Sequence, residues 1–417
     1  MSMQYDVIVI GGGASGMMAA GRAGELGARV LLLEKNPTLG KKLLITGGGR
    51  CNVTNEEYNH QVLLSKFKSS KKFLFSPFSQ FDVADALEFF HKKDMPTKTE
   101  NNQRVFPESN RSQSVWNVLT HYMGNSNVEI KPDSEVSGFT YANEEITGVT
   151  LTDGTVLTAK KYILATGGKS RPETGSTGDG FTWLADIGHT VIHQEPSLVP
   201  VTVSDMWAHK LAGVSMKDVK ITILQNHQRQ QSAIGDMLFT HVGLSGPLIL
   251  NMSRAIGELL QYGEVTLSLD TRPHTDIGAL DAELVEHFST NSNKKIKNTL
   301  GHFITPALAS AVLEKSGVNP EHFVHSIYRE QRAKIVRTMK ALTMNVSGLL
   351  GPEKAIITSG GVKLEEVNFK TMQSKKFPNL YIIGDMLNID RPSGGYSLQL
   401  CWTTGFVAGT HSAQQDS

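Results

Sequence analysis

The stretch from residue 5 to residue 16 reads Tyr-Asp-Val-Ile-Val-Ile-Gly-Gly-Gly-Ala-Ser-Gly. Its first half is a short β-branched apolar run that stops at three glycines, as a buried strand of a parallel sheet does. Small side chains then dominate residues 14–26, which would let a helix lie close on that sheet before Gly27 ends it. A second apolar run covers residues 28–33. Together these segments predict a βαβ unit of about 30 residues.

The glycines of this turn have the spacing Gly11-x-Gly13-x-x-Gly16. Gly11 allows the tight turn, Gly13 lets the backbone approach a pyrophosphate at the helix N-terminus, and Gly16 allows close helix packing. Glu34, at the end of the second strand, is placed to accept hydrogen bonds from ribose hydroxyls and to disfavour a 2′-phosphate. The pattern predicts a dinucleotide site; a glycine-rich turn of another α/β protein, such as a methyltransferase, is the alternative.

The C-terminal part of the chain helps to distinguish FAD from a nicotinamide dinucleotide. Residues 380–383 form an apolar run followed by Gly384 and Asp385. In FAD proteins a strand that ends in Gly-Asp places a carboxylate near the ribityl hydroxyls, whereas a nicotinamide dehydrogenase has no need of it. An ordinary strand-to-loop Gly-Asp is the alternative. Because Glu34 and Asp385 would meet one ligand, we predict a cofactor domain built from both ends of the chain.

Apolar runs that end in glycines are no longer found from about residue 196 to about residue 342. We therefore predict a discontinuous α/β domain, residues 1–195 and 343–417, interrupted by an inserted mixed strand and helix domain, residues 196–342, that covers the cofactor site. A small antiparallel meander is expected over residues 136–157, before the insertion. In the insertion we expect strands at 219–224 and 264–269, helices at 280–288 and 306–315, and one longer helix at 320–342.

The amino-acid composition of the chain argues against some classes of binding partner. The 417 residues carry 41 Lys and Arg against 40 Asp and Glu, a net charge of +1. This balance argues against a nucleic-acid clamp or a polybasic membrane binder, so we expect neither a membrane nor a nucleic-acid partner. Lysine clusters at residues 66–72 and 294–297 are interpreted as solvated faces, with RNA contact as the alternative. The two cysteines, Cys51 and Cys401, favour a reducing cytoplasm, and no metal site is expected.

Five further motifs resemble one known family. They are Thr46-Gly-Gly-Gly-Arg-Cys-Asn-Val-Thr-Asn55, Ala165-Thr-Gly-Gly168, Thr240-His-Val-Gly-Leu-Ser-Gly-Pro247, Thr358-Ser-Gly-Gly-Val362 and Gly394-Gly-Tyr-Ser-Leu-Gln399. In combination they look like the bacterial NAD(P)/FAD-dependent oxidoreductases known as aminoacetone-oxidase-like, and the resemblance covers essentially the whole chain. It implies a Rossmann-like FAD-binding fold of the glutathione-reductase and fumarate-reductase type with an inserted α+β domain. Asn388, Arg391 and Ser397 stand where Asp, Gly and Asn are usual in that family.

The predicted function is an FAD-binding oxidoreductase that acts on a small organic substrate by hydride transfer at flavin N5. Members of the family have been linked to amine oxidation and to reduction of steroid-like enones. No second strand with a Gly-x-Gly-x-x-Gly turn follows, so NAD(P)H is expected only as a transient donor, with oxygen as another partner for the flavin. The alternatives are a flavin-dependent RNA-modifying enzyme and a non-catalytic FAD-binding redox sensor.

Site residues follow from the motifs and the resemblance. The candidates for catalysis are His241, as an acid or base near neutrality, Arg50 and Tyr396. Cys51 is expected to be a buried packing residue rather than a redox partner of the flavin. The residues expected to hold the cofactor are Gly11, Gly13, Ala14, Ser15, Gly16, Glu34, Lys35, Lys42, Gly49, Arg50, Cys51, Asn52, Val136, Ala165, Thr166, Gly167, Gly168, Gly384, Asp385, Gly395, Tyr396, Ser397 and Leu398.

Overall fold

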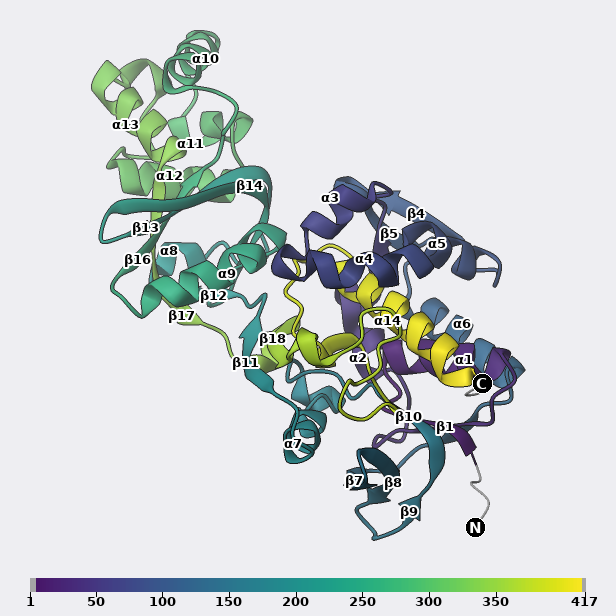
Figure 1. Cartoon of the computed structure of the whole chain (residues 1–417). Coiled ribbons are helices and arrows are strands. Elements are labelled where there is room, and N and C mark those ends of the chain that lie inside the picture. Colours follow the sequence, from purple (N-terminus) through teal and green to yellow (C-terminus); the bar gives the residue numbers. More distant parts are fainter. Residues whose placement is uncertain (1–4, 415–417) are drawn as a thin grey trace. The chain divides into compact units, whose positions relative to one another are not determined.

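The computed structural model describes residues 5–414 and divides into two compact units (Figure 1). The first unit consists of the chain up to Ser197 and the chain from Pro352 onward. The second unit is the continuous segment Leu198–Gly351. Within residues 5–414, no helix is long and apolar enough to cross a membrane.

A five-stranded parallel sheet forms the centre of the first unit. Its strand order is β19(Leu380–Ile382), β10(Ala159–Leu164), β1(Tyr5–Ile10), β2(Val30–Leu33) and β6(Glu129–Lys131). The predicted βαβ unit is confirmed, since β1 and β2 are adjacent and the intervening helix is α1(Ala14–Glu25). Because β10 pairs with both β1 and β19, the sheet joins the two ends of the chain.

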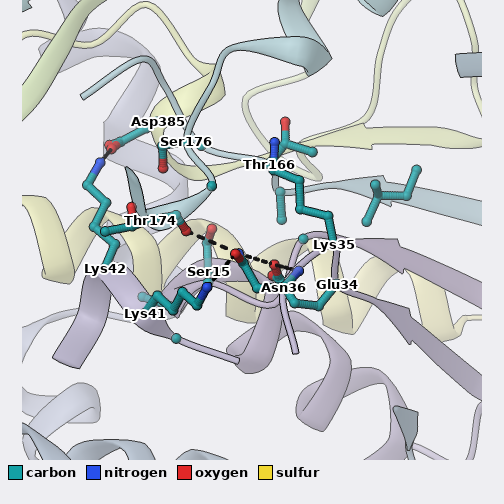
Figure 2. A pocket seen from close by; sticks show the side chains of 18 of the residues that line it. Ser15, Glu34, Lys35, Asn36, Lys41, Lys42, Thr166, Thr174, Ser176 and Asp385 are labelled. Carbon is teal, nitrogen blue, oxygen red and sulfur yellow. Dashed lines mark hydrogen bonds and ion pairs between the residues drawn. The ribbon is translucent and has the colours of Figure 1, made fainter. Parts of the chain in front are cut away.

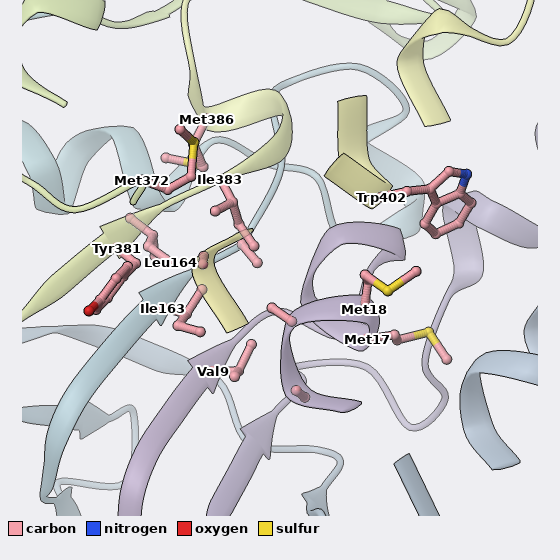
Figure 3. Packing of buried hydrophobic residues seen from close by; sticks show 14 of the residues in the cluster. Val9, Met17, Met18, Ile163, Leu164, Met372, Tyr381, Ile383, Met386 and Trp402 are labelled. Carbon is pink, nitrogen blue, oxygen red and sulfur yellow. The ribbon is translucent and has the colours of Figure 1, made fainter. Parts of the chain in front are cut away.

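Two helices from opposite ends of the sequence pack closely on this sheet. Figure 3 shows Met17 and Met18 of α1 and Trp402 of α14(Tyr396–Ala413), which belong to the same buried cluster as Val9 of β1. The contact depends on glycine: a Cβ at Gly405 would lie 2.6 Å from the backbone oxygen of Ser15. This approach leaves no room for a side chain, so helix–helix packing fixes α14 against α1.

The remaining elements of the first unit surround the sheet. The helices are α2(Lys41–Ile45), α3(His60–Ser65), α4(Lys71–Gln80), α5(Val83–His91), α6(Ser112–Asn125) and α7(Asp179–Asp186). Three small sheets are β3(Thr54–Asn55)–β5(Arg104–Pro107)–β4(Thr97–Glu100), β7(Val136–Ala142)–β8(Glu145–Leu151)–β9(Val156–Leu157) and β11(Val191–Ser197)–β18(Ile357–Val362). The second of these sheets is the predicted antiparallel meander.

The second unit is a closed barrel with helices packed on it. Its strand order is β12(Val201–Val203), β15(Gly243–Ser245), β14(Gln228–Thr240), β13(Ser215–Gln225), β16(Val265–Asp270) and β17(Leu342–Leu349). The helices are α8(Met206–His209), α9(Pro247–Leu260), α10(Ile277–Thr290), α11(Ile296–Thr299), α12(Pro306–Ser316) and α13(Arg329–Lys340). Closing a barrel leaves no sheet edge open, which explains why short strands far apart in sequence are stable here.

One element prediction in this unit is wrong. The expected single helix at 320–342 begins only at Arg329, and Leu342 already starts β17. Residues before Arg329 pair instead with the chain near Lys295, through an antiparallel bridge to Phe323. Leu342 and Met344 are fully buried because β17 closes the barrel between β16 and β12. For the same reason the insertion ends at Gly351 and not at Leu342.

The α1–α14 contact makes a first prediction. Gly405→Ala forces a methyl group against the Ser15 carbonyl, and we expect it to destabilise the protein by about 1–3 kcal/mol. Gly124→Ala is the matched control, because Gly124 is also helical and its Cβ would meet nothing within 4 Å. We expect that change to be neutral or stabilising by up to about 1 kcal/mol. Urea unfolding of both apoproteins tests this, and equal midpoints would contradict the role given to Gly405.

Candidate functional site

A cavity lies at the carboxyl ends of the central strands of the first unit (Figure 2). It encloses about 1180 Å³ of empty space, part of which is open to solvent. Its walls include the residue that ends β1, Ile10, and the residue that ends β2, Leu33. Binding sites of open parallel sheets lie outside these strand ends. The lining residues therefore lie where such a sheet holds its ligand.

The glycine-rich turn forms one wall. Gly11 has φ +102, and a Cβ there would lie 2.6 Å from the Ala165 carbonyl oxygen. A Cβ at Gly16 would lie 1.9 Å from the Gly11 oxygen. Gly13 differs, because it caps α1, lines the cavity, and its Cβ would meet nothing within 4 Å. The N-terminal turn of α1 thus offers its backbone N–H groups to the cavity, which favours an anionic group such as a phosphate.

The Glu34 carboxylate is held in place by backbone N–H groups. One oxygen accepts a hydrogen bond of 2.8 Å from the Gly12 N–H. The other accepts from the N–H of Asn36 at 2.9 Å and from its side-chain amide at 2.6 Å. Glu34 is buried, and its carboxylate lines the cavity beside the turn. The oxygen that accepts from Gly12 keeps a second lone pair, so this geometry leaves an acceptor for a ribose hydroxyl.

A loop far along the chain closes the same end of the cavity. The side-chain amide of Asn36 donates to the Thr174 carbonyl oxygen at 3.1 Å, and the Lys35 ammonium pairs with Asp179 at 2.7 Å. Lys41 donates to the Asn36 side chain at 2.8 Å. Figure 2 shows the Asn36 side chain between Glu34 and Thr174, with Lys41 beside it. Sequence analysis included Lys35 but missed Asn36 and Lys41, because only the fold joins Asn36 to Thr174 far along the chain.

Three charged side chains meet at the other end. Asp385 accepts from the Lys42 ammonium at 3.3 Å and forms an ion pair with Arg391. The Arg391 guanidinium is buried, and it also donates to the Ser397 hydroxyl at 3.0 Å and to the Ile389 carbonyl oxygen at 2.8 Å. Burial alone would raise the pKa of Asp385, but the two neighbouring cations outweigh it and lower that pKa. Two positive charges against one negative leave this end of the cavity positive.

The structure brings most of the predicted cofactor residues to the cavity. Those that line it are Gly11, Gly13, Ala14, Ser15, Glu34, Lys35, Lys42, Val136, Ala165, Thr166, Gly167, Asp385, Ser397 and Leu398. The predicted residues that do not line it are Gly16, Gly49, Arg50, Cys51, Asn52, Gly168, Gly384, Gly395 and Tyr396. Lining residues that sequence analysis missed include Thr46, Ser134, Ser176, Trp183, Ile356 and Cys401. Of these, Thr46 and Ser176 lie in glycine-rich stretches that signal a ligand.

Arg50 lies away from the cavity. Its guanidinium pairs with Glu100, donates to Asn110 at 2.8 Å and lies 4.1 Å from the centre of the Phe106 ring. These contacts fix the strands and loops around β5. In this structure Arg50 braces a loop and its charge is balanced by a carboxylate, and the contact of Arg50 with the cofactor or the substrate stays a prediction.

The two cysteines differ in their position relative to the cavity. Cys51 is fully buried away from the cavity, and burial raises the pKa of its thiol to about 12. Cys401, on α14, lines the cavity, and burial raises the pKa of its thiol to about 12 as well. Both thiols therefore stay protonated near neutral pH, and neither is an activated nucleophile. The packing role expected of Cys51 agrees with its burial.

The two other catalytic candidates also lie outside the cavity lining. Tyr396 is the buried first residue of α14, with its ring edge-on to Phe67 at 6.1 Å between centroids. Burial raises the pKa of Tyr396, so the phenol stays neutral. His241 is exposed in the turn between β14 and β15 of the second unit. No group of three or more His, Cys, Asp or Glu side chains in the described part of the chain is arranged to hold a metal ion.

These features define a class of proteins. Their Rossmann-like fold, here built from both ends of the chain, holds a flavin dinucleotide at the ends of its strands. The cradle at Gly13, the Glu34 carboxylate and the Asp385 cluster fit the phosphates, ribose and ribityl chain of FAD. The chain belongs to the family described as "HI0933-like protein Rossmann domain", which matches residues 5–411. FAD is the cofactor that this family implies, and the resemblance seen in the motifs is confirmed.

Two curated relatives match over nearly their whole length. The 3-dehydro-bile acid delta(4,6)-reductase of Clostridium scindens is 30% identical over 414 residues, which cover 98% of each chain. The ribosomal RNA dihydrouridine synthase of Escherichia coli is 30% identical over 408 residues, which cover 97% of each chain. Both are oxidoreductases of the same flavoprotein family.

Among solved structures, the fold is similar to that of the Escherichia coli quinol fumarate reductase FrdA. The TM-score is 0.54 at 13% identity, over 98% of this chain and 70% of the other. At that identity the likeness shows the fold alone. It confirms the predicted Rossmann-like FAD-binding fold of the fumarate-reductase type with an inserted domain.

The open space in front of Gly13, at the start of α1, leads to a second prediction. Gly13 has an extended backbone, and its Cβ points into open space, so Gly13→Val is compatible with the fold. The new side chain would fill the space in front of the α1 N-terminus, and we expect FAD affinity to fall at least tenfold while urea unfolding of the apoprotein stays within about 0.5 kcal/mol. Flavin absorbance after reconstitution measures the affinity. Unchanged FAD affinity would place the phosphates elsewhere.

The Asp385 cluster makes a third prediction. Asp385→Asn leaves the buried Arg391 cation without its carboxylate, and we expect a loss of about 3–5 kcal/mol in apoprotein stability. Adding Arg391→Met, which removes the charge at similar length, should recover most of that loss. Urea unfolding of the wild type, both single variants and the double variant completes the cycle. Additive effects would show that the two side chains are not coupled.

Proposed function

We propose that this protein is an FAD-dependent reductase of a carbon–carbon double bond conjugated with a carbonyl group. The supporting observation is the chemistry that its two full-length relatives share by name. The delta(4,6) double bonds of a 3-dehydro bile acid are conjugated with its ketone, and dihydrouridine arises when the double bond next to the uracil carbonyl is saturated. In the proposed reaction, a hydride adds to the conjugated system at a carbon remote from the carbonyl, and a proton adds nearer to it.

In this proposal, residues of the cavity bind each part of the cofactor. The N-terminal turn of α1, from Gly13 to Ser15, binds the pyrophosphate, and the Glu34 carboxylate binds the adenosine ribose. Asp385, with Lys42 and Arg391, lies at the ribityl end. FAD bound there supplies a hydride donor at flavin N5. The excess positive charge of the cluster favours electron-rich states of a group held beside it.

An unpartnered acceptor supports placing the flavin ring near the start of α14. The side-chain amide of the buried Asn55 donates to the carbonyl oxygens of Asn102, at 3.0 Å, and Gly394, at 3.2 Å. Its own amide oxygen has no hydrogen-bond partner among the described residues. A buried acceptor of this kind costs about 1–3 kcal/mol unless a ligand satisfies it, and the imide N–H of a flavin is a suitable donor.

The proton and the electrons need further partners. Neutral Tyr396 is the proposed proton donor within the first unit, and His241 is the proposed one from the inserted unit. NAD(P)H is the proposed transient electron donor, since no second Gly-x-Gly-x-x-Gly unit is present in the sequence. A small conjugated ketone and a uridine in RNA are the two substrate classes that the relatives suggest.

Anaerobic spectroscopy of the FAD-loaded protein tests the reaction class. We expect NADH or NADPH to bleach the flavin absorbance and a conjugated cyclic enone, or uridine-containing RNA, to restore it. The saturated ketone of the same ring size is the control and should leave the flavin reduced. If every conjugated carbonyl leaves the flavin reduced while oxygen or an amine changes it, the protein is an oxidase or a redox sensor instead. Protein that stays colourless with FAD would contradict flavin chemistry altogether.

A further inference from the structure

A strongly basic surface lies on the helices that follow the glycine-rich loop of the first unit. From residue 58 to residue 81 the chain has four lysines and no aspartate or glutamate. The lysines are Lys66, Lys68, Lys71 and Lys72, and all four are exposed. In the described structure none of them forms an ion pair. We call this region, with Val62 and Phe75, the α3–α4 surface.

Other charged groups do not neutralise this surface. Asp82, the acid that ends the run, caps α5 through the Ala84 and Asp85 N–H groups and pairs with His60 at 2.8 Å. The lysine cluster of the second unit is different, because Lys295 and Lys297 both pair with Glu321 and hold the pKa of that carboxyl at about 2. Of the two clusters, only the α3–α4 surface keeps all its positive charge available.

An exposed aromatic ring lies among these cations. Phe75 is 63% exposed, which is unusual for a phenylalanine. Lys71 and Lys72 precede it on α4 by four and three residues, so their side chains flank the ring on one face of the helix. Val62 and Lys66 are likewise exposed neighbours one turn apart on and just after α3. The surface therefore combines unpaired ammonium groups with one planar ring open to solvent.

This combination fits a nucleic-acid strand better than a lipid surface. A helix that lies in a membrane interface presents a continuous apolar face, but Phe75 is the one large apolar side chain that α4 exposes. Its other exposed residues are Lys71, Lys72, Ser79 and Gln80. A single-stranded nucleic acid has phosphates for the ammonium groups and bases that stack on a ring, each stack contributing about 1–3 kcal/mol.

The surface is close in the fold to the cavity described above. α4 packs on α14, whose first turn contributes Ser397 and Leu398 to the cavity wall. Phe67, between α3 and α4, contacts the ring of Tyr396, and the Ser70 hydroxyl donates to the Asn388 carbonyl oxygen at 3.5 Å. A strand bound on α3 and α4 therefore lies one helix away from the residues at the ribityl end.

We propose that the α3–α4 surface binds single-stranded RNA, with the four lysines on its phosphates and Phe75 against a base. This inference extends the proposed function, because it names the macromolecule that would carry a uracil to the cavity. It also replaces the expectation that no nucleic acid binds: the net charge of +1 is an average over the whole chain, while binding depends on the local surface.

Fluorescence anisotropy of the full-length, FAD-loaded protein with a labelled uridine-rich single-stranded RNA tests the proposal. Replacing Lys66, Lys68, Lys71 and Lys72 with Gln should raise Kd at least tenfold and reduce the salt slope of log K by about 3, since each phosphate contact contributes about 0.7. Phe75→Ser should raise Kd at least fivefold without changing the salt slope. The control replaces Lys294, Lys295 and Lys297 with Gln and should change Kd less than twofold.

Three results would overturn the proposal. They are RNA affinity that is unchanged in the four-lysine variant, an equal loss in the control variant, or retention by anionic lipid vesicles in place of RNA. Circular dichroism and flavin content of each variant show whether it is folded. Binding is measured without turnover, so a failure of enone or uridine reduction is distinguished from a failure of RNA binding.

Discussion

The pairing of β10 with β1 on one edge and β19 on the other is the constraint on which the rest of the first unit depends. It places the chain near residue 382 beside the chain near residue 163, and α14 then returns across the sheet against α1. The cavity walls come from these separate segments. If β19 were not seated on the sheet, Asp385 and the first turn of α14 would have no fixed position relative to the glycine-rich turn.

Close backbone approach is the second common feature. Gly11, Gly16 and Gly405 allow strand, turn and helix to touch where any Cβ would collide with a carbonyl group. At Gly13 the same lack of a side chain leaves open space in front of a helix N-terminus. Glycine therefore has two separate roles in this unit. It allows tight packing beneath the site, and it leaves room within the site. A dianionic pyrophosphate held by helix N–H groups needs no basic surface around it.

Charge is distributed unevenly although its sum is near zero. Asp385, Lys42 and Arg391 leave a positive centre at one end of the cavity, while at the other end the carboxylates of Glu34 and Asp179 lie with the ammonium groups of Lys35 and Lys41. The exposed lysines of α3 and α4 form a separate positive region on the same unit. These local differences matter for ligands because charges act over about 8–10 Å at physiological salt, a short distance relative to the molecule.

The sequence by itself determined the βαβ unit, the dinucleotide turn, the class of cofactor and the two-ended domain, because each depends on a local requirement such as apolar runs, positive φ or a strand-end carboxylate. It also identified fourteen residues that line the cavity, from Gly11 to Leu398. Only the tertiary structure decided that Arg50 braces a loop, that Cys401 and not Cys51 lines the cavity, and that Arg391 pairs with Asp385. It likewise brought Asn36 to Thr174 and started β17 where a helix was expected. Except for the Arg391–Asp385 pair, these outcomes depend on contacts between residues far apart in the chain, and no local pattern contains them.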